Sequence, residues 1–258
     1  MNDWNPASYA KFAGQRLQPA LDLLMRIGDL PAGEVIDLGC GTGIVGRFLK
    51  DRFPGRQLTG FDNSPAMLAE ARATGSYDEL SLGDAAGWQP ERSQALIYSN
   101  ALLHWLPDHA SLLKRLTSFL EPGGWLAVQI PNQNSAQSQR LWLDLVAELF
   151  PGRFDPAMAP SILTGNEYIR ILEPLGAVSL WETIYYQRLK PAEIGHPVRQ
   201  FTVSTFARPI LDILDASEQD ALIKAYDRHV EGVYPLLEDG GVVFPFRRLF
   251  FTVQKDGG

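Results

Sequence analysis

The sequence has little cysteine and no long apolar run. Its one cysteine, Cys40, excludes a disulfide within the chain and is compatible with a reducing compartment. No stretch approaches the ~18 uninterrupted apolar residues of a membrane-spanning helix. The opening Met-Asn-Asp-Trp is not a basic segment followed by an apolar one, as a secretory signal would be. We therefore expect a cytoplasmic protein without disulfides or membrane spans.

Positive charge is also scarce. The 23 lysines and arginines are outnumbered by 30 acidic residues, which gives a net charge of −7, and the basic residues are scattered. This argues against a nucleic-acid partner and favours a small substrate. The 258 residues, 45% of them hydrophobic, suit one α/β domain, and they contain no repeats or low-complexity segments. We expect a monomer with no nucleic-acid or membrane partner.

The feature that organises the chain is a strand-like run followed by alternating glycines, Glu34-Val-Ile-Asp-Leu-Gly-Cys-Gly-Thr-Gly43. Its apolar residues suit a strand buried on both faces of a parallel sheet. Gly39, Gly41 and Gly43 lack the Cβ atoms that would keep a ligand away from the backbone. The apolar run 44–49 predicts a helix that opens at this loop. Strand, glycine turn and helix form the first half of a nucleotide-binding βαβ unit.

Two ligands compete for this loop. The dinucleotide pattern G-x-G-x-x-G is present as Gly41-Thr-Gly-Ile-Val-Gly46 and favours a pyrophosphate. However, Asp37 lies inside the turn with no Lys or Arg nearby in sequence, and its charge would repel a pyrophosphate. S-adenosylmethionine carries an ammonium and a sulfonium group and no phosphate, so the acidic loop suits it better. An NAD-dependent oxidoreductase stays as a distant alternative.

A second acidic residue follows the next predicted strand, 57–61. Asp62 lies about 20 residues beyond the loop, where an acidic side chain can accept hydrogen bonds from both ribose hydroxyls. The sequence Asp62-Asn63-Ser64-Pro65 is also typical of a helix start. Because Ser64 can provide the helix cap, we expect Asp62 to be left for the ribose. Met67 on this helix is a candidate contact for the adenosine.

Polar and aromatic residues also follow the third predicted strand, 79–82. The Asp84 carboxylate can accept a hydrogen bond from the adenine amine, Ala85 lies beside it, and Trp88 can supply stacking area for the ring. The alternative is an aspartate in a turn and a tryptophan in the core. Both interpretations stay open on the sequence.

The fourth predicted strand, 95–99, lies near the centre of the sheet, where ligands bind if the strand order reverses. Asn100 follows it and offers amide donors and acceptors, and His104 and Trp105 are placed to line the methyl-transfer pocket. His104 is either a hydrogen-bonded wall residue or a general base. The sequence Glu121-Pro-Gly-Gly124 predicts a turn into the fifth strand, 125–130, and Gln129 and Asn132 lie at the carboxyl end of that strand.

Two further β-rich runs, 178–189 and 244–253, predict the last two strands. Helical segments form two insertions, at about 133–164 and 190–240, which are too long for simple connections. We expect them to cover the active site.

The order of these signals over residues 34–131 resembles the class I S-adenosylmethionine-dependent methyltransferases. The resemblance implies one Rossmann-like domain spanning 1–258: an α/β fold with a seven-stranded, mostly parallel sheet, an antiparallel last strand and helices on both faces. Finer features narrow the resemblance to those members of the family that esterify trans-aconitate. These features are Trp4-Asn-Pro6, Tyr9, Arg16, 99–109, 126–132 and 246–250.

The resemblance implies methyl transfer to a carboxylate of trans-aconitate, which gives a monomethyl ester and S-adenosylhomocysteine. No catalytic acid or base is required, because a carboxylate with a pKa near ~4 is already ionised at pH 7. One departure from this branch is His104, where Gln is usual. The alternatives are a methyltransferase acting on another small acid or on an oxygen, nitrogen or carbon nucleophile, and a ligand-binding regulator.

The carboxylates that do not react must be held by cations, and the planar fork of arginine suits this task. Alternation in the last strand places Arg248 on one face with Phe244, Phe246 and Phe250, so it needs either the substrate or an internal salt bridge. The predicted cofactor-binding residues are Asp37, Gly39, Gly41, Gly43, Asp62, Asn63, Met67, Asp84, Ala85, Trp88, Asn100 and His104. The predicted substrate-binding residues are Tyr9, Arg16, Trp105, Gln129, Asn132, Arg199 and Arg248, and no metal site is expected.

Overall fold

The computed structural model describes residues 13–257. Its strands form one seven-stranded sheet in the order β3-β2-β1-β4-β5-β7-β6. The strands are β1 (Glu34–Leu38), β2 (Leu58–Asp62), β3 (Glu79–Leu82), β4 (Gln94–Asn100), β5 (Leu120–Pro131), β6 (Ala177–Leu189) and β7 (Val242–Gln254). The pairs from β3 to β5 are parallel, and β7 pairs antiparallel with β5. The predicted mostly parallel sheet with an antiparallel last strand is therefore confirmed.

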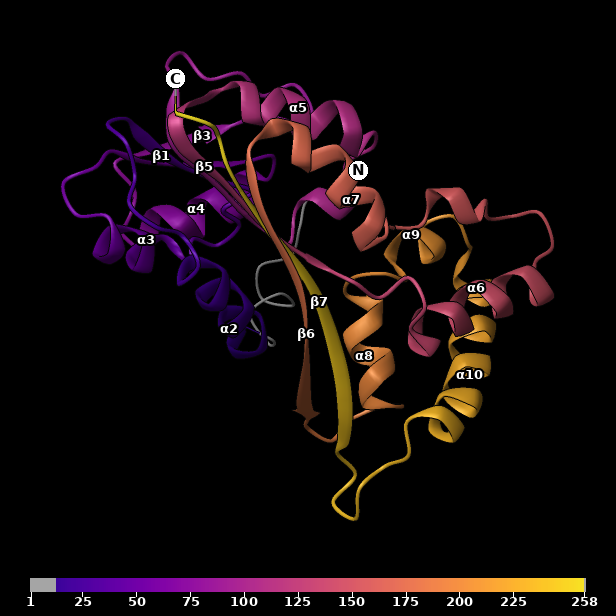
Figure 1. Cartoon of the computed structure of the whole chain (residues 1–258). Coiled ribbons are helices and arrows are strands. Elements are labelled where there is room, and N and C mark those ends of the chain that lie inside the picture. Colours follow the sequence, from indigo (N-terminus) through magenta and orange to yellow (C-terminus); the bar gives the residue numbers. More distant parts are fainter. Residues whose placement is uncertain (1–12, 258) are drawn as a thin grey trace. The chain divides into compact units, whose positions relative to one another are not determined.

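Helices connect most of the successive strands (Figure 1). The α-helices are α2 (Ala13–Leu24), α3 (Gly46–Arg52), α4 (Pro65–Ala73), α5 (His109–Ser118), α6 (Gln137–Leu149), α7 (Gly165–Leu172), α8 (Pro197–Val203), α9 (Arg208–Leu211) and α10 (Ala216–Val233). Short 3-10 turns are η1 (Leu103–Trp105), η2 (Pro156–Met158) and η3 (Glu173–Leu175). None of the helices within 13–257 is long and apolar enough to cross a membrane.

The chain divides into two compact units. The first consists of Met1–Pro131, Leu163–Glu182 and Arg248–Gly258, and the second of Asn132–Ile162 and Thr183–Arg247. In the first unit α2 and α5 pack against β5, while α3 and α4 pack against β2. In the second unit α10 packs against α6 and α8.

The sequence explains where the strands lie. β4 is buried at every position except its last, as expected for an apolar strand with neighbours on both edges and cover on both faces. In β7 the alternate residues Phe244, Phe246, Arg248 and Phe250 are all buried, as the alternation predicted. Pairing between β4 and β5 jumps from Gln94↔Leu120 to Leu96↔Trp125, so the predicted Glu-Pro-Gly-Gly turn is an excursion within β5.

The helix boundaries differ in detail from the predicted ones. The helix expected at 44–49 begins only at Gly46, because the glycine loop continues through a turn in which the Gly46 amide donates to the Gly43 carbonyl. The predicted cap is confirmed, because Ser64 caps α4. Thr164 and Glu167 form the capping box of α7.

Candidate active site

The glycine loop between β1 and α3 is held open by backbone conformations that favour glycine. Gly39, Gly41 and Gly43 have φ angles of 81°, 54° and 76°. A Cβ atom on Gly41 would meet nothing within 4 Å, whereas one on Gly39 would lie 2.9 Å from the Leu102 side chain. A Cβ on Gly43 would lie 2.9 Å from the Ala71 backbone. Of the three glycines, Gly41 is therefore the one that leaves room for a ligand.

Asp37 is the fourth residue of β1, whereas it was predicted to lie inside the turn; its carboxyl group is buried, with 2% of the residue's surface exposed. The Tyr77 hydroxyl donates a hydrogen bond of 2.7 Å to its Oδ2 atom. Burial raises the pKa of Asp37 to about 7; the Tyr77 hydrogen bond lowers it, and the negative charge of Asp62 adds to the rise. A cation bound beside Asp37 would favour its ionised form, so this position suits a positively charged ligand group.

Asp62, at the tip of β2, ties the loop to the next strand. Its Oδ2 accepts a hydrogen bond of 2.9 Å from the Gly41 amide, and its Oδ1 accepts one of 2.9 Å from the Ser64 amide. Ser64 in turn accepts from the Met67 amide at 3.2 Å and caps α4. The cap assignment is confirmed, but Asp62 is already engaged on both oxygens. A hydrogen bond from a ribose hydroxyl would therefore use a second lone pair on one of the Asp62 carboxylate oxygens.

The segment after β3 exposes Asp84 and buries Trp88. Asp84 accepts a hydrogen bond of 2.9 Å from the Ala86 amide, which shapes a turn. The ring of Trp88 lies 6.3 Å from that of Phe61 and 5.7 Å from that of Phe119, centroid to centroid. Trp88 thus packs in the core, which was the alternative interpretation, and a contact with adenine stays a prediction.

Arg115 fixes this segment and was missed in the sequence. From α5 its guanidinium donates to the carbonyls of Ala85 at 3.2 Å, Ala86 at 2.7 Å and Trp88. An arginine fork can hold several acceptors at once, so one side chain sets the course of the whole turn. A basic residue in the last turn of a helix is common, and no local pattern marks this one as special.

At the carboxyl ends of β4 and β5, polar side-chain atoms are buried without hydrogen-bond partners in the described part of the chain. They are Asn100 Oδ1, His104 Nδ1 and both amide atoms of Gln129. Asn100 pairs with Gln129 in the sheet, so their side chains lie on one face. The next residue, Ala101, has a φ of 58°, a conformation that costs energy in a residue other than glycine. Buried atoms of this kind usually meet a ligand or water.

His104, in η1, is a neutral side chain whose Nδ1 atom is buried. Burial lowers its pKa to about 3, with further contributions from the positive charge of Arg248 and from His109. Its ring lies 5.0 Å from that of Trp105, centroid to centroid. A general base works best when its pKa lies near the working pH, so His104 is poorly suited to accept a proton at pH 7.

His109 holds the turn that carries His104, and it too was missed in the sequence. Its Nε2 lies 2.9 Å from the Leu103 carbonyl oxygen, which can only accept, so Nε2 carries the proton. Its Nδ1 then accepts from the hydroxyl of Tyr168 at 2.6 Å. Both residues are buried, so η1 is fastened to α7 through two hydrogen bonds.

The predicted substrate-binding residues differ in their burial and in the unit to which they belong. Arg248 is 2% exposed and pairs with Pro131 in the sheet, on the face that also bears Gln129. Asn132, in the second unit, is half-buried, and its amide donates to the Arg247 carbonyl at 3.0 Å. Tyr9 lies outside the described residues, and so does the side chain of Arg16 in α2.

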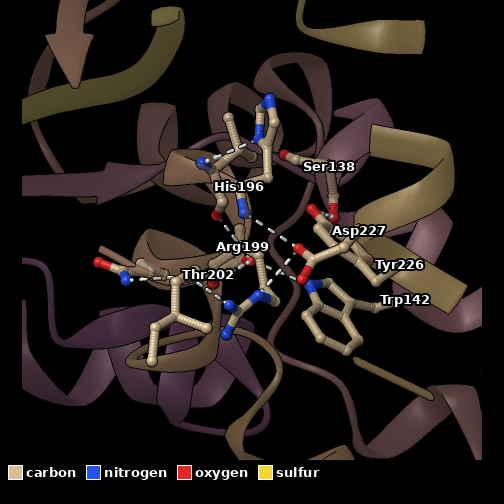
Figure 2. Close-up of polar contacts among 10 residues, drawn as sticks. Ser138, Trp142, His196, Arg199, Thr202, Tyr226 and Asp227 are labelled. Atoms are coloured by element: carbon tan, nitrogen blue, oxygen red, sulfur yellow. Dashed lines mark hydrogen bonds and ion pairs between the residues drawn. The ribbon is translucent and has the colours of Figure 1, made fainter. Parts of the chain in front are cut away.

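Arg199 belongs to the second unit and forms an internal ion pair there. Figure 2 shows its guanidinium directed at Asp227, with Nε donating to Oδ1 at 2.9 Å. Nη2 donates to the Ile194 carbonyl at 2.5 Å, and the Asp227 carboxylate also accepts from the His196 amide at 3.2 Å. The internal salt bridge considered for the arginines is thus what the structure has at Arg199.

Residues 9–180 match the family described as the methyltransferase domain. The chain belongs to this family. It is also 40% identical to a trans-aconitate 2-methyltransferase of Methylobacterium radiotolerans, over 99% of each chain. It is 37% identical to one of Rhizobium meliloti, over 98% of this chain and 99% of that one. At these identities and coverages, the chain is a member of the trans-aconitate 2-methyltransferase family.

Solved structures agree on the methyltransferase fold. Phosphoethanolamine N-methyltransferase 2 of Haemonchus contortus, in complex with S-adenosyl-L-methionine, matches 93% of this chain and 53% of its own, with a TM-score of 0.55 and 17% identity. The YcgJ protein of Bacillus subtilis matches 93% of this chain and 99% of its own, with a TM-score of 0.56 and 15% identity. Identities this low bear on the fold alone.

Proposed function

We propose that this methyltransferase transfers a methyl group from S-adenosylmethionine to a carboxylate of trans-aconitate, giving a monomethyl ester and S-adenosylhomocysteine. The substrate is suggested by the full-length relatives that bear that name. The observation that carries the reaction type is the neutral His104 beside the cation Arg248. This pair suits a nucleophile that is already an anion and has no proton to lose.

The residues of the first unit fit S-adenosylmethionine. Gly41 leaves open space at the loop. The proposed partner of the ammonium group is Asp37, and that of the ribose hydroxyls is Asp62, which bonds to the Gly41 amide. Asp84 is exposed on the segment proposed for the adenine, and Asn100 Oδ1 is a buried acceptor in need of a donor. When bound, S-adenosylmethionine supplies a sulfonium methyl group: a carboxylate oxygen bonds to the methyl carbon, the carbon–sulfur bond breaks with its electron pair on sulfur, and no proton moves.

The chain itself has to orient the substrate and remove its water. The Gln129 amide offers a donor and an acceptor, and Arg248 can bind a carboxylate that does not react. The two reacting charges neutralise each other, so a water-poor crevice favours the reaction. Correct placement of the oxygen can contribute on the order of 7–11 kcal/mol.

We propose that 1–258 works as one methyltransferase domain, in which the second unit corresponds to the helical insertions expected at 133–164 and 190–240. A small polycarboxylate is its proposed partner, and we propose that the enzyme acts as a monomer in the cytoplasm. Size-exclusion chromatography with light scattering tests the monomer, and fluorescence microscopy of a tagged full-length chain tests the location.

Product analysis tests the proposed reaction. The protein is incubated with methyl-labelled S-adenosylmethionine and, separately, trans-aconitate, cis-aconitate, citrate, a phenol and an amine. We expect label in trans-aconitate as a methyl ester, recognised by its mass and by release of methanol in mild base. Preferred labelling of the phenol or amine would favour a methyltransferase for another nucleophile. Calorimetric binding of NAD instead of S-adenosylmethionine would favour the oxidoreductase.

A further inference from the structure

Three glycines around the loop make room for one internal aromatic ring. A Cβ atom on Gly43 would lie 3.0 Å from the ring of Tyr77, one on Gly46 2.6 Å and one on Gly60 2.9 Å. Contacts under 3.0 Å essentially do not occur for real Cβ atoms, so a side chain at Gly46 or Gly60 would displace the ring, and one at Gly43 would press against it. Gly43 and Gly46 are the second and third glycines of the literal G-x-G-x-x-G pattern. Here they accommodate a tyrosine of the chain itself, which explains the pattern without a dinucleotide.

The ring of Tyr77 is fixed on its other sides as well. It packs, together with Leu80, against a buried cluster of Cys40, Leu68 and Ala71. Tyr77 lies between α4 and β3, and its hydroxyl reaches 2.7 Å from Asp37 Oδ2, a residue 40 positions earlier in the chain. Since the ring has little freedom, this hydrogen bond fixes the direction of the Asp37 carboxylate.

We propose that Tyr77 is a positioning residue of the methyl-donor site, whose hydroxyl orients the Asp37 carboxylate toward the donor's ammonium group. The inference rests on the proposed function, because it assumes that S-adenosylmethionine binds at the glycine loop. It adds a residue that does not itself touch the ligand and that no sequence motif marks.

The groups that face Asp37 explain why the hydroxyl matters. They are the Tyr77 hydroxyl, the Cys40 thiol, the Tyr98 hydroxyl and the Asp62 carboxylate. Burial raises the pKa of the thiol and of both phenols, so all three are neutral at physiological pH. The charge of Asp62 opposes ionisation of Asp37, whereas the Tyr77 hydrogen bond favours it. Without that hydrogen bond Asp37 takes up a proton more readily and attracts a cation less.

The test is Tyr77→Phe, which keeps the ring between the glycines and removes only the hydroxyl. Calorimetry measures the Kd of S-adenosylmethionine and of 5′-methylthioadenosine from pH 6 to pH 9. The second ligand retains the adenine and ribose and lacks the ammonium group. For S-adenosylmethionine we expect about fivefold to tenfold weaker binding at pH 7 and a smaller difference at pH 9. Binding of 5′-methylthioadenosine should not change.

Tyr98→Phe is the matched control. It also removes a buried phenolic hydroxyl from the neighbourhood of Asp37, but this one donates to the Ala20 carbonyl at 2.7 Å. It should lower the Tm and leave the pH profile of binding in place. In Asp37→Asn the effect of Tyr77→Phe on S-adenosylmethionine should disappear, because the two residues act through one hydrogen bond.

Two results would overturn the proposal while leaving the proposed function intact. One is an unchanged affinity and pH profile for S-adenosylmethionine in Tyr77→Phe. The other is equal weakening of both ligands, which would make Tyr77 a support of the loop only. Failure of the unmodified protein to bind S-adenosylmethionine would instead overturn the proposed function, and this inference with it.

Discussion

The hydroxyl of Tyr168 and the Nδ1 atom of His109 lie 2.6 Å apart, and their rings are stacked with centroids 5.7 Å apart. Tyr168 belongs to α7 and His109 to the first turn of α5, so the bond joins two helices that are far apart in sequence. Through the other ring nitrogen of His109 it also reaches the Leu103 carbonyl, in the turn that carries His104 and Trp105. The position of this turn therefore depends on α7, a helix outside the glycine-loop half of the sheet.

We predict that Tyr168→Phe lowers both stability and turnover. The substitution leaves the buried His109 Nδ1 without its donor, which costs on the order of 1–3 kcal/mol. Thermal unfolding should show a lower Tm, and kcat should fall more than the affinity for S-adenosylmethionine, because the loosened turn lies at the reacting end. Tyr186→Phe is the control, since Tyr186 is 73% exposed and should change neither. A kcat equal to that of the unmodified protein would contradict this role.

The sequence predicted much of the fold because strong local signals agreed with one another. The apolar runs of β1 and β4 and the capping residue Ser64 lie where they were expected. The start of α3 was less accurate, because the loop uses three successive left-handed glycines that no hydrophobic period reveals. The parallel and antiparallel pairing of the strands was predicted from the family resemblance and not from the spacing of apolar residues.

The site was predicted less completely, because its supports come from distant parts of the chain. Asp37 and Asp62 lie near the carboxyl ends of their strands and were recognisable. The Tyr77 hydroxyl, however, reaches Asp37 across 40 residues, and the Arg115 guanidinium reaches the Trp88 carbonyl, in the segment after β3, across 27. The sequence also did not show which side chains are buried. Trp88, which was predicted to lie beside the adenine, packs against Phe61 and Phe119. A sequence shows which side chains have suitable chemistry, but the packing determines what they face.

We predict that His104→Gln retains substantial activity. Because the pKa of His104 is about 3 in the folded protein, the side chain is neutral at pH 7, and an ionised carboxylate needs no base. A loss of kcat by about a hundredfold or more would point to proton abstraction and so to another type of nucleophile. Below pH 6.5 the unfolded chain protonates this histidine and the folded protein does not, so stability is lost as pH falls. His104→Gln should therefore resist acid unfolding better.

We predict that Asp62→Ala weakens S-adenosylmethionine binding and that Asp62→Asn does so less. The carboxylate shapes the loop through the Gly41 amide, and it is proposed to accept from the ribose, a charged contact of about 1.5–3 kcal/mol. Asparagine keeps one acceptor oxygen for the loop and loses the charge. Calorimetric titration of both variants gives the two losses, and an unchanged Kd in Asp62→Ala would remove Asp62 from the site.

We predict that Asp84→Ala weakens S-adenosylmethionine and leaves the pH profile of turnover unchanged, because an adenine contact involves no proton transfer. Its carboxylate also shapes the turn through the Ala86 amide, so Asp84→Asn is the matched variant that keeps an acceptor. If Asp84→Ala abolished turnover while the cofactor bound normally, the adenine assignment would be wrong.

Arg248 and Arg199 should respond differently to the same substitution. We predict that Arg248→Met raises the KM for the polycarboxylate far more than that for S-adenosylmethionine, since the cation lies beside His104 and on the face of Gln129. Arg199→Met breaks the ion pair with Asp227 and should lower the Tm without kinetic selectivity. Steady-state kinetics with each substrate varied in turn separates the two. Equal changes in both KM values for Arg248→Met would assign it to structure.

Folding changes the protonation of Asp37. Its pKa is raised from 3.8 to about 7 by folding, so between these values the folded protein holds more protons than the unfolded chain, and stability falls as pH rises through this window. At pH 8 the ionisation of buried Asp37 lowers the free energy of unfolding by on the order of 4 kcal/mol. Ligand-free Asp37→Asn should therefore have a higher Tm than the unmodified protein at pH 8, and nearly the same Tm at pH 4.

A bound ammonium group reverses this balance, because it favours the ionised carboxylate. We therefore expect S-adenosylmethionine to release close to one proton when it binds at pH 6, where Asp37 of the ligand-free protein is mostly protonated. Calorimetry in two buffers with different ionisation enthalpies measures this number directly. Asp37→Asn should bind more weakly and release none of that proton. A binding enthalpy that does not depend on the buffer in the unmodified protein would show that the ammonium group is held elsewhere.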